Sequence, residues 1–314
     1  MANMHLLFLD FDSEIKLSTT KSDDLRRGRD ALREDVKGWF SDNSKQAPSF
    51  CWQGSFAMKT TVNPINGTEY DIDDGVYLNG YDCDQDEWPS TVTVHSWVKT
   101  ATDDRTSQDS IDKNTCVRIC YAAGYHIDLP IYIMKDDVAY LAHKSKGWIE
   151  SDPKAFTDWF IGLVKDQGEQ LRRIVRYLKA WKDYDDVPLK GIELTILAAN
   201  NYDSFVDRDD KALKNTLANI ILSLERSYSC RKPVAPYEDL FESHSETKQK
   251  TIIAALKRLK TKIEAAIAEK DEEQASLKLR EVLGDRFPKG EPNATEKYER
   301  TPAPGVLRHD GRSG

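Results

Sequence analysis

The chain has 314 residues and a formal net charge of -8, with 45 Lys and Arg side chains against 53 Asp and Glu. Hydrophobic residues make up 39% and charged residues 31%, which is typical of a globular protein long enough for one large or two small domains. The acidic balance argues against obligate binding of long nucleic acids, and no apolar run is long enough to span a bilayer. The five cysteines lack metal-ligand spacing and fit a reducing compartment.

The N-terminal apolar run from His5 to Phe11 is interrupted by Asp10 and lacks a basic flank. It does not resemble a secretory signal, and we therefore expect a cytoplasmic protein. The first helix is expected over residues 22–40, with Ser22 as its N-cap and an apolar face at helical spacing. A strand over 49–52 follows and leads into a tight turn at Gly54-Ser55, where a short helix begins and can present backbone N–H groups to a phosphate.

A strand predicted over residues 70–78 carries Asp71 and Asp73 on either side of one apolar residue. Side chains at i and i+2 of a strand point to the same face, so the two carboxylates project together. Their repulsion at about 4 Å is on the order of 4 kcal/mol at an effective dielectric constant near 20. A divalent cation with a preference for oxygen ligands, Mg²⁺ or Mn²⁺, would neutralise the pair. Asp74 points to the opposite face and is expected to be structural.

A helix over 89–103 and strands over 115–123, 125–134 and 138–142 complete the first part of the chain. Asp128 lies inside the second of these strands, between Ile127 and Leu129. A charged residue in such a strand is costly unless it is paired or bound to a metal. Three acidic residues on neighbouring strands beside a Gly-Ser turn indicate two-metal phosphoryl or nucleotidyl transfer.

From Ser151 onward the pattern is helical. Ser151 or Asp152 caps a helix with Pro153 in its first turn, which continues to about residue 164. Further helices are expected over 168–184, 189–201, 209–226, 246–269 and 271–284. We therefore divide the chain into a catalytic sheet domain over 1–150, a helical domain over 151–286 and a flexible tail over 287–314, with the active-site cleft between the two domains.

Three phrases and one longer block together resemble a known family. The phrases are Gln-Gly-Ser-Phe at 53–56, Asp-Ile-Asp-Asp-Gly at 71–75 and His-Ile-Asp-Leu-Pro at 126–130, and the block covers 171–182. They are similar to the cGAS/DncV-like nucleotidyltransferases (CD-NTases) of bacterial antiphage signalling (CBASS), within the polymerase-β-like nucleotidyltransferase superfamily. The resemblance covers roughly residues 20–285 and implies an α+β fold, with a nucleotidyltransferase sheet domain followed by a helical domain.

The resemblance also implies roles for individual residues. Asp71, Asp73 and Asp128 would be the catalytic carboxylates and would bind two Mg²⁺ or Mn²⁺ ions, with Asp128 also acting as the base toward the attacking ribose hydroxyl or orienting it. Gly54 and Ser55 would hold the donor triphosphate.

On the helical side, the resemblance implies a lysine and a hydroxyl residue that contact the donor triphosphate. Lys179 and Thr195 match these positions, with Lys182 as the rival lysine. Arg118 matches an arginine that helps to position the acceptor nucleotide, and a cross-strand ion pair is the alternative. Gln53 either contacts a nucleotide or is simply a polar strand end.

Other residues have simpler interpretations. Tyr202 could stack on a nucleobase, although a core or rim position is favoured. His126 is expected to have a structural hydrogen-bonding role, and the basic run over 248–262 is expected to be the solvated face of a helix.

The resemblance implies synthesis of a cyclic di- or trinucleotide from nucleoside triphosphates, with ATP among the substrates, and a downstream effector reached through that product. Some family members are joined through a C-terminal small residue to other molecules by an E1/E2-like ligase, which would apply to Gly314, although a frayed terminus explains this glycine equally well. Two alternatives stay open: linear nucleotidyl transfer to RNA or to a small molecule, and a non-catalytic nucleotide-binding scaffold. The resemblance implies neither membrane association nor obligate DNA binding.

Overall fold

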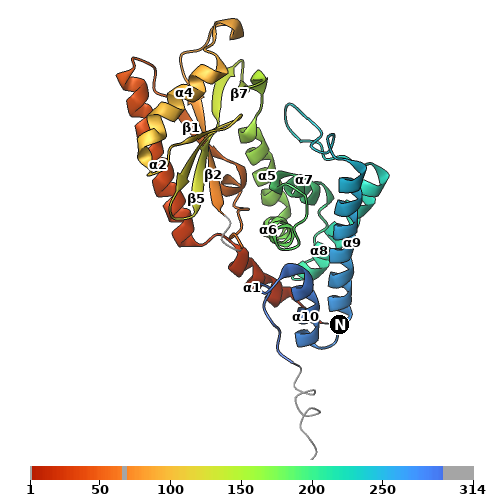
Figure 1. Ribbon diagram of the computed structural model, residues 1–314. Helices are drawn as coiled ribbons and strands as arrows, with labels where there is room; N and C mark the ends of the chain where they lie inside the picture. Colours follow the sequence, from red (N-terminus) through yellow and green to blue (C-terminus); the bar gives the residue numbers. More distant parts are fainter. Residues whose placement is uncertain (1, 66–68, 293–314) are drawn as a thin grey trace, which may run out of the picture.

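The computed structural model describes residues 2–65 and 69–292. These residues form a sheet half and a helical half that lie side by side (Figure 1). Each half has its own large hydrophobic core. The expected α+β architecture, with a sheet domain followed by a helical domain, is confirmed.

The sheet half has eight strands within the described residues, in one mixed sheet ordered β3-β4-β5-β2-β6-β7-β8, with β1 paired to β2 off this path. Their bounds are β1 Ser49–Gln53, β2 Tyr70–Leu78, β3 Ile111–Asp112, β4 Val117–Tyr121, β5 Tyr125–Leu129, β6 Ile131–Lys135, β7 Val138–His143 and β8 Gly147–Glu150. The short strands β3 and β8 were not expected from the sequence, because runs of two and four residues carry little periodicity.

The single strand expected over 125–134 is divided into β5 and β6. Both parts pair with β2 in parallel, and the carbonyl of Pro130 between them accepts from the backbone N–H of Val76 at 2.8 Å. Proline has no N–H to donate, which interrupts the ladder at this one residue. β5 and β6 therefore continue each other along one edge of β2, while β1 pairs antiparallel with β2 along the other edge.

Two helices, α2 (Thr19–Asp42) and α4 (Thr91–Thr102), contribute to the core of the sheet half. Their N-caps are Ser18 and Ser90, each of which accepts a hydrogen bond from the backbone three residues later. The expected N-cap at Ser22 is wrong, because α2 begins one turn earlier. Short 3₁₀ turns lie at Gln85–Glu87 and Asp103–Arg105, and the short helix α3 spans Gly54–Ala57.

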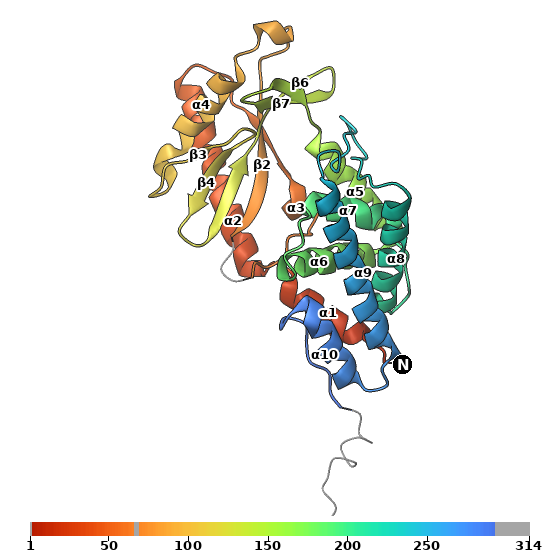
Figure 2. The same cartoon turned by 45° about the vertical axis from the view of Figure 1, so that its right-hand side comes forward.

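Within the described residues, the helical half consists of α1 and the six helices from α5 to α10 (Figure 2). Their bounds are α1 His5–Ile15, α5 Pro153–Gln167, α6 Glu169–Tyr184, α7 Gly191–Asn201, α8 Asp209–Arg226, α9 Glu246–Ala268 and α10 Glu272–Leu283. Asp152 caps α5 and Pro153 lies in its first turn, as expected. The central helix α6 is buried on most sides, with Tyr177 and Trp181 fully inside the core.

The sequence did not predict α1. Its Phe8 and Phe11 pack against Tyr177 of α6 and against Phe287, with ring centroids 5.1–5.7 Å apart. The N-terminus thus lies in the core of the helical half, although its sequence precedes the sheet.

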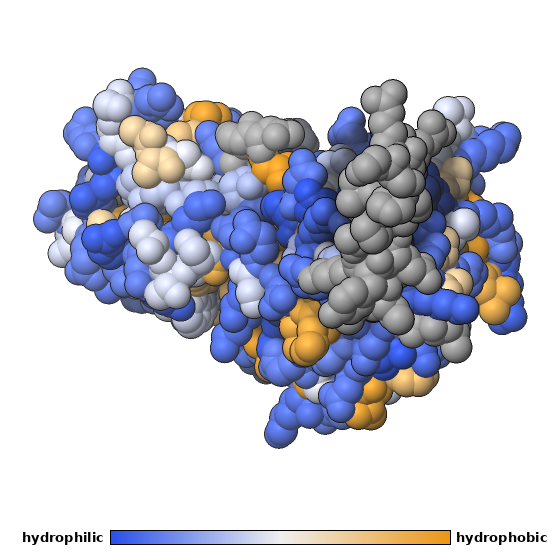
Figure 3. Space-filling model, turned by 90° about the horizontal axis from the view of Figure 1, so that it is seen from below, coloured by the Kyte–Doolittle hydropathy of each residue, from blue (hydrophilic) through white to orange (hydrophobic). Residues whose placement is uncertain are grey.

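The surface is largely hydrophilic on the face shown in Figure 3, with small separate apolar patches among the described residues. None of the helices in residues 2–65 and 69–292 combines the length and the apolar character needed to cross a bilayer.

Candidate active site

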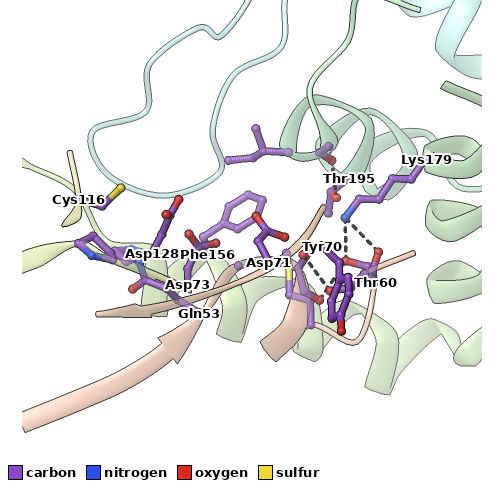
Figure 4. Close-up of a pocket in the computed structure, with 18 of the residues that line it drawn as sticks. Gln53, Thr60, Tyr70, Asp71, Asp73, Cys116, Asp128, Phe156, Lys179 and Thr195 are labelled. Carbon is purple, nitrogen blue, oxygen red and sulfur yellow. Dashed lines mark hydrogen bonds between the residues drawn. The ribbon is translucent and has the colours of Figure 1, made fainter. Parts of the chain in front are cut away.

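A cavity of about 900 Å³ lies between the sheet half and the helical half. Strands β1, β2 and β5 and the turn at Gly54-Ser55 line one side, while α6, α7 and the loop that follows α8 line the other. Figure 4 shows the carboxylates of the sheet opposite Lys179 and Thr195. Of the nine residues proposed from the sequence, eight line this cavity: Gln53, Gly54, Ser55, Asp71, Asp73, Asp128, Lys179 and Thr195.

The three acidic residues come together through the register of the sheet. Asp71 and Asp73 lie on β2, and the Cα of Asp73 is paired with that of Asp128 on the neighbouring β5. Asp74, the next residue on β2, points away and accepts two hydrogen bonds from Arg33 of α2, at 2.5 and 2.7 Å. The expectation that Asp74 is structural agrees with this contact.

The surroundings of Asp73 strongly disfavour its charged form. Removal from water raises the pKa of its carboxyl to about 8, and the nearby charges of Asp71 and Asp128 contribute further, against an opposing effect of Arg118. In the chain without ligands, the ionised form of Asp73 is therefore unfavourable. A positive charge brought beside it would reverse that penalty.

Arg118 does not line the cavity. It lies on β4 directly opposite Asp128 and donates two parallel hydrogen bonds to that carboxylate, from Nε and Nη2, both at 2.7 Å. The cross-strand ion pair considered as the alternative is thus present. Because Asp128 is held in this way, it is already partnered before any ligand binds.

This pairing bears on metal binding. In the part of the chain that the structure describes, no group of three or more His, Cys, Asp or Glu side chains is arranged to hold a metal ion. The donor set instead suits a cation bound by one or two carboxylates together with phosphate oxygens of a substrate, which is the usual environment of Mg²⁺.

The turn at Gly54-Ser55 depends on glycine. Gly54 has φ = +69°, and a Cβ at this position would overlap the carboxylate of Asp73. Gly54 therefore allows the turn to lie directly against Asp73, which is one of the candidate metal ligands. The Ser55 hydroxyl shares a hydrogen bond with Thr61 at 2.9 Å.

Gln53, immediately before the turn, is 5% exposed. Its side-chain nitrogen donates to the hydroxyl of Tyr132 at 3.1 Å, while its Oε1 has no protein partner. A buried acceptor without a partner on a cavity wall is available to a ligand donor.

On the helical side, Lys179 is buried and donates to the Thr60 hydroxyl at 2.9 Å and to the Thr60 carbonyl at 3.2 Å. Burial lowers the pKa of Lys179 to about 8, and Asp71 opposes this effect. The rival Lys182 also lines the cavity but forms an ion pair with Asp183 at 2.6 Å. The Thr195 hydroxyl donates to the carbonyl of Gly191 within its own helix, at 2.8 Å.

Two residues considered from the sequence are held by protein contacts. The Tyr202 hydroxyl donates to Gln170 Oε1 at 2.8 Å, and Tyr202 packs beside the helical core instead of lining the cavity. His126 is buried, with Nδ1 at 2.8 Å from Glu69 and Nε2 at 4.0 Å from Asp71.

Some lining residues were missed. Thr60 and Thr61 follow α3, and Lys232, Val234 and Ala235 belong to the loop after α8. The polar pair Thr60-Thr61 directly after the Gly-Ser turn was visible in the sequence, but the loop after α8 carries no motif that points to the cavity.

Two family models match the sequence. Residues 48–132 match the model described as cyclic GMP-AMP synthase DncV-like, nucleotidyltransferase domain, and residues 168–295 match the C-terminal domain of cyclic GMP-AMP synthase. The first match covers the Gly-Ser turn and the three acids, and the second covers α6 and α7 with Lys179 and Thr195. Both walls of the cavity therefore lie in matched regions.

Relatives of known product are similar over much of the chain. A cyclic GMP-AMP synthase of Escherichia albertii is 30% identical over 220 residues, which are 65% of this chain and 47% of that protein, so the match spans about half the relative's length. A cyclic AMP-AMP-AMP synthase of Acinetobacter sp. is 24% identical and matches 90% of this chain and 84% of its own. The structure of Vibrio cholerae DncV cyclic AMP-GMP synthase with the linear intermediate 5′ pppA(3′,5′)pG has a TM-score of 0.78 at 21% identity, over 91% of this chain and 97% of that one.

Proposed function

Because this chain belongs to the cGAS/DncV-like nucleotidyltransferases, we propose that it joins nucleoside triphosphates into a cyclic di- or trinucleotide and releases pyrophosphate. The relatives are named for a two-membered and a three-membered product, so ring size is left open. The observation that carries the proposal is the single cavity shared by the acids of the sheet and by Lys179 and Thr195 of the helical half.

Divalent cations fit this site because the carboxyl of Asp73 is withdrawn from water and lies beside the charges of Asp71 and Asp128. Asp71, Asp73 and Asp128 would hold two Mg²⁺ or Mn²⁺ ions together with phosphate oxygens of the nucleotide. When bound, these ions neutralise the phosphates and stabilise the charge that develops on the departing pyrophosphate.

The remaining lining residues bind and orient the donor. Ser55 and the Gly54 backbone donate to its triphosphate, and Lys179 adds a positive charge from the opposite wall. Thr195 can turn its hydroxyl from the Gly191 carbonyl to a phosphate oxygen, because a threonine in a helix has two favourable rotamers.

The acceptor side completes the reaction. The acceptor ribose hydroxyl attacks the α-phosphorus of the donor in line, the bond to the β-phosphate oxygen breaks, and pyrophosphate leaves. Asp128 accepts the hydroxyl proton or orients the hydroxyl, for which its hydrogen bonds to Arg118 have to be exchanged. Arg118, once released, is free to contact the acceptor nucleotide, and the free Oε1 of Gln53 is a further acceptor for it.

Ring closure requires that the first product stays in the cavity and is turned round for the next transfer. A volume of about 900 Å³ is at the upper end of ordinary ligand pockets and leaves room for two nucleotides. The related V. cholerae synthase has been solved with a linear intermediate, which supports the same order of events here.

We extend the proposal to the biological role that the family implies. The cyclic product would act in the cytoplasm as an antiphage second messenger and would reach a downstream effector. Conjugation through Gly314 by an E1/E2-like ligase is part of the same proposal, and Gly314 lies outside the described residues.

The test is incubation of the purified protein with all four radiolabelled nucleoside triphosphates and Mg²⁺ or Mn²⁺, followed by phosphatase, chromatography and mass spectrometry. The double variant Asp71→Ala/Asp73→Ala is the control. A phosphatase-resistant product that is absent from the variant would establish cyclisation and identify bases and ring size. Phosphatase-sensitive products alone would favour linear transfer, and nucleotide binding without pyrophosphate release would favour a non-catalytic scaffold.

A further inference from the structure

Three cations on one face of α6 reach from the helical half to three consecutive backbone carbonyls. Arg172, Arg176 and Lys179 are spaced at i, i+4 and i+7, so they share a helix face. Their nitrogen atoms donate to the carbonyl oxygens of residues 58, 59 and 60, in that order, at 3.0, 2.8 and 3.2 Å. All three side chains are buried. We call residues 58–63, which follow α3, the strap.

The strap is continuous with the wall proposed to bind phosphate. Its residues Thr60 and Thr61 line the cavity beside Gly54 and Ser55. The Thr60 N–H donates to the Ser55 carbonyl at 2.8 Å, and the Ser55 and Thr61 hydroxyls are 2.9 Å apart. Any displacement of the strap would therefore move Ser55.

The strap is attached to the helical half. Met58 belongs to the helical core. At the other end, the Asn63 N–H donates to the carbonyl of Ile15 in α1 at 2.6 Å, and its side-chain amide donates to the carbonyls of Glu14 and Lys16. Arg286 donates to the Asn63 carbonyl at 2.7 Å. The wall that contacts β2 is thus fixed from the opposite half of the molecule.

Arg176 is the centre of this arrangement. It is 5% exposed and does not line the cavity. One side of its guanidinium makes a bidentate contact with Asp12 of α1, at 2.7 and 2.8 Å, while Nη1 donates to the Lys59 carbonyl. Lys59 lies in a turn outside the helices and strands, so its carbonyl is not part of a backbone ladder, and Arg176 supplies it with a donor.

We propose that Arg176 is a positioning residue for the phosphate-binding wall. It holds residues 54–61 at a fixed distance from Lys179, so that the groups contacting the donor triphosphate form one unit carried by the helical half. This inference rests on the proposed function only in that the ligand is a nucleoside triphosphate.

Two variants separate positioning from simple packing. Arg176→Lys keeps a positive charge for Asp12 but loses the planar fork that serves Asp12 and the strap together. Asp12→Asn weakens the link to α1 and leaves the Arg176–Lys59 contact in place. If Arg176→Lys does not fold, Arg172→Lys takes its place, because it loosens the neighbouring contact between Arg172 and the Met58 carbonyl.

The first readout is hydrogen–deuterium exchange without nucleotide. The amides of residues 58, 59 and 60 donate to the carbonyls of residues 54, 56 and 55. A peptide covering 54–61 should exchange about tenfold faster in Arg176→Lys, the size expected for loss of one charge-assisted hydrogen bond, and at the wild-type rate in Asp12→Asn. Equal exchange in the wild type and Arg176→Lys, or equal acceleration in both variants, would overturn the proposal.

The second readout is the dissociation constant of α,β-methylene analogues of ATP and GTP with Mg²⁺, measured by calorimetry. Arg176→Lys should bind about tenfold more weakly, whereas Asp12→Asn should bind as the wild type does. Unchanged affinity in Arg176→Lys would refute the positioning role. Failure of the wild type to bind either analogue would refute the proposed function instead, and the exchange experiment would still decide whether Arg176 holds the strap.

Discussion

We predict that Asp73→Asn makes the protein more stable at neutral and alkaline pH when divalent cations are absent. Burial and the neighbouring acids raise the pKa of Asp73 from 3.8 to about 8, so the folded chain resists its ionisation. Asparagine has nearly the same shape and carries no charge. It therefore removes the unfavourable charge without leaving a hole.

The size of the effect follows from this shift. A difference of about four pKa units, at about 1.4 kcal/mol each, sets an upper limit of about 6 kcal/mol on the increase in the free energy of unfolding that Asp73→Asn can cause. Because Asp73 lines the cavity and is only partly buried, screening by solvent reduces that limit, and we expect a gain of about 2–4 kcal/mol at pH 8.

The sign of the pH dependence is fixed by linkage. Between about pH 4 and pH 8 the folded wild type binds a proton at Asp73 that the unfolded chain has released, so its stability falls as pH rises through this window. Asp73→Asn lacks this dependence. The difference between the two proteins should therefore be small at pH 4, grow up to about pH 8 and then level off.

Urea unfolding at several pH values in EDTA measures the effect. Asp209→Asn is the control with the opposite sign: although burial raises the pKa of Asp209, hydrogen bonds from Arg173, Gln170 and Tyr177 outweigh it and lower that pKa. Asp209→Asn should therefore destabilise the protein at pH 7, by about 2–3 kcal/mol, and progressively less as pH falls below 4. If Asp73→Asn is no more stable than the wild type at pH 8, or if its advantage does not grow with pH, the electrostatic reasoning is wrong.

Three further predictions concern single residues of the site. Gly54→Ala should lower kcat by about 100-fold, because the added Cβ overlaps Asp73 and displaces the turn. Gly38→Ala on α2 is the control and should leave kcat unchanged, because a Cβ there meets no other atom; steady-state assays compare the two variants. Lys179→Met should weaken triphosphate binding by about 10- to 100-fold, as measured by calorimetry. It should not lower the melting temperature of the nucleotide-free protein, because burial lowers the pKa of Lys179 to about 8 and makes its charge costly. A lower melting temperature would contradict this reasoning. Arg118→Met should tighten Mn²⁺ binding in a nucleotide-free titration followed by electron paramagnetic resonance, since it frees Asp128, and weaker binding would show that the pair supports the metal site.

The acidic side of the site was predictable from the sequence because strand geometry is local. Alternation puts Asp71 and Asp73 on one face whatever the rest of the fold, and an acid inside an apolar strand identifies Asp128. The pairing of Arg118 with Asp128 was visible as an alternative, since a turn near Gly124 brings them opposite each other. The sequence did not decide between this pair and a nucleotide contact.

The strap was not predictable, for a different physical reason. Its acceptors are backbone carbonyls, which every residue has, and its donors lie more than 110 positions away on α6. Neither periodicity nor residue type marks such a contact. The same applies to α1, whose apolar face packs on Tyr177 and Phe287, both remote in sequence.

The charges around the cavity connect its stability with its proposed chemistry. Seven acids line it among the described residues, Glu69, Asp71, Asp73, Asp128, Asp152, Asp183 and Asp186, against the three lysines 179, 182 and 232. A triphosphate alone would be repelled by this excess, so its binding has to be coupled to uptake of cations. The same acids favour a nucleotide that arrives with its metal ions over a free triphosphate. The gain in stability predicted for Asp73→Asn measures the free energy of unfolding that the folded chain loses by keeping one of these acids.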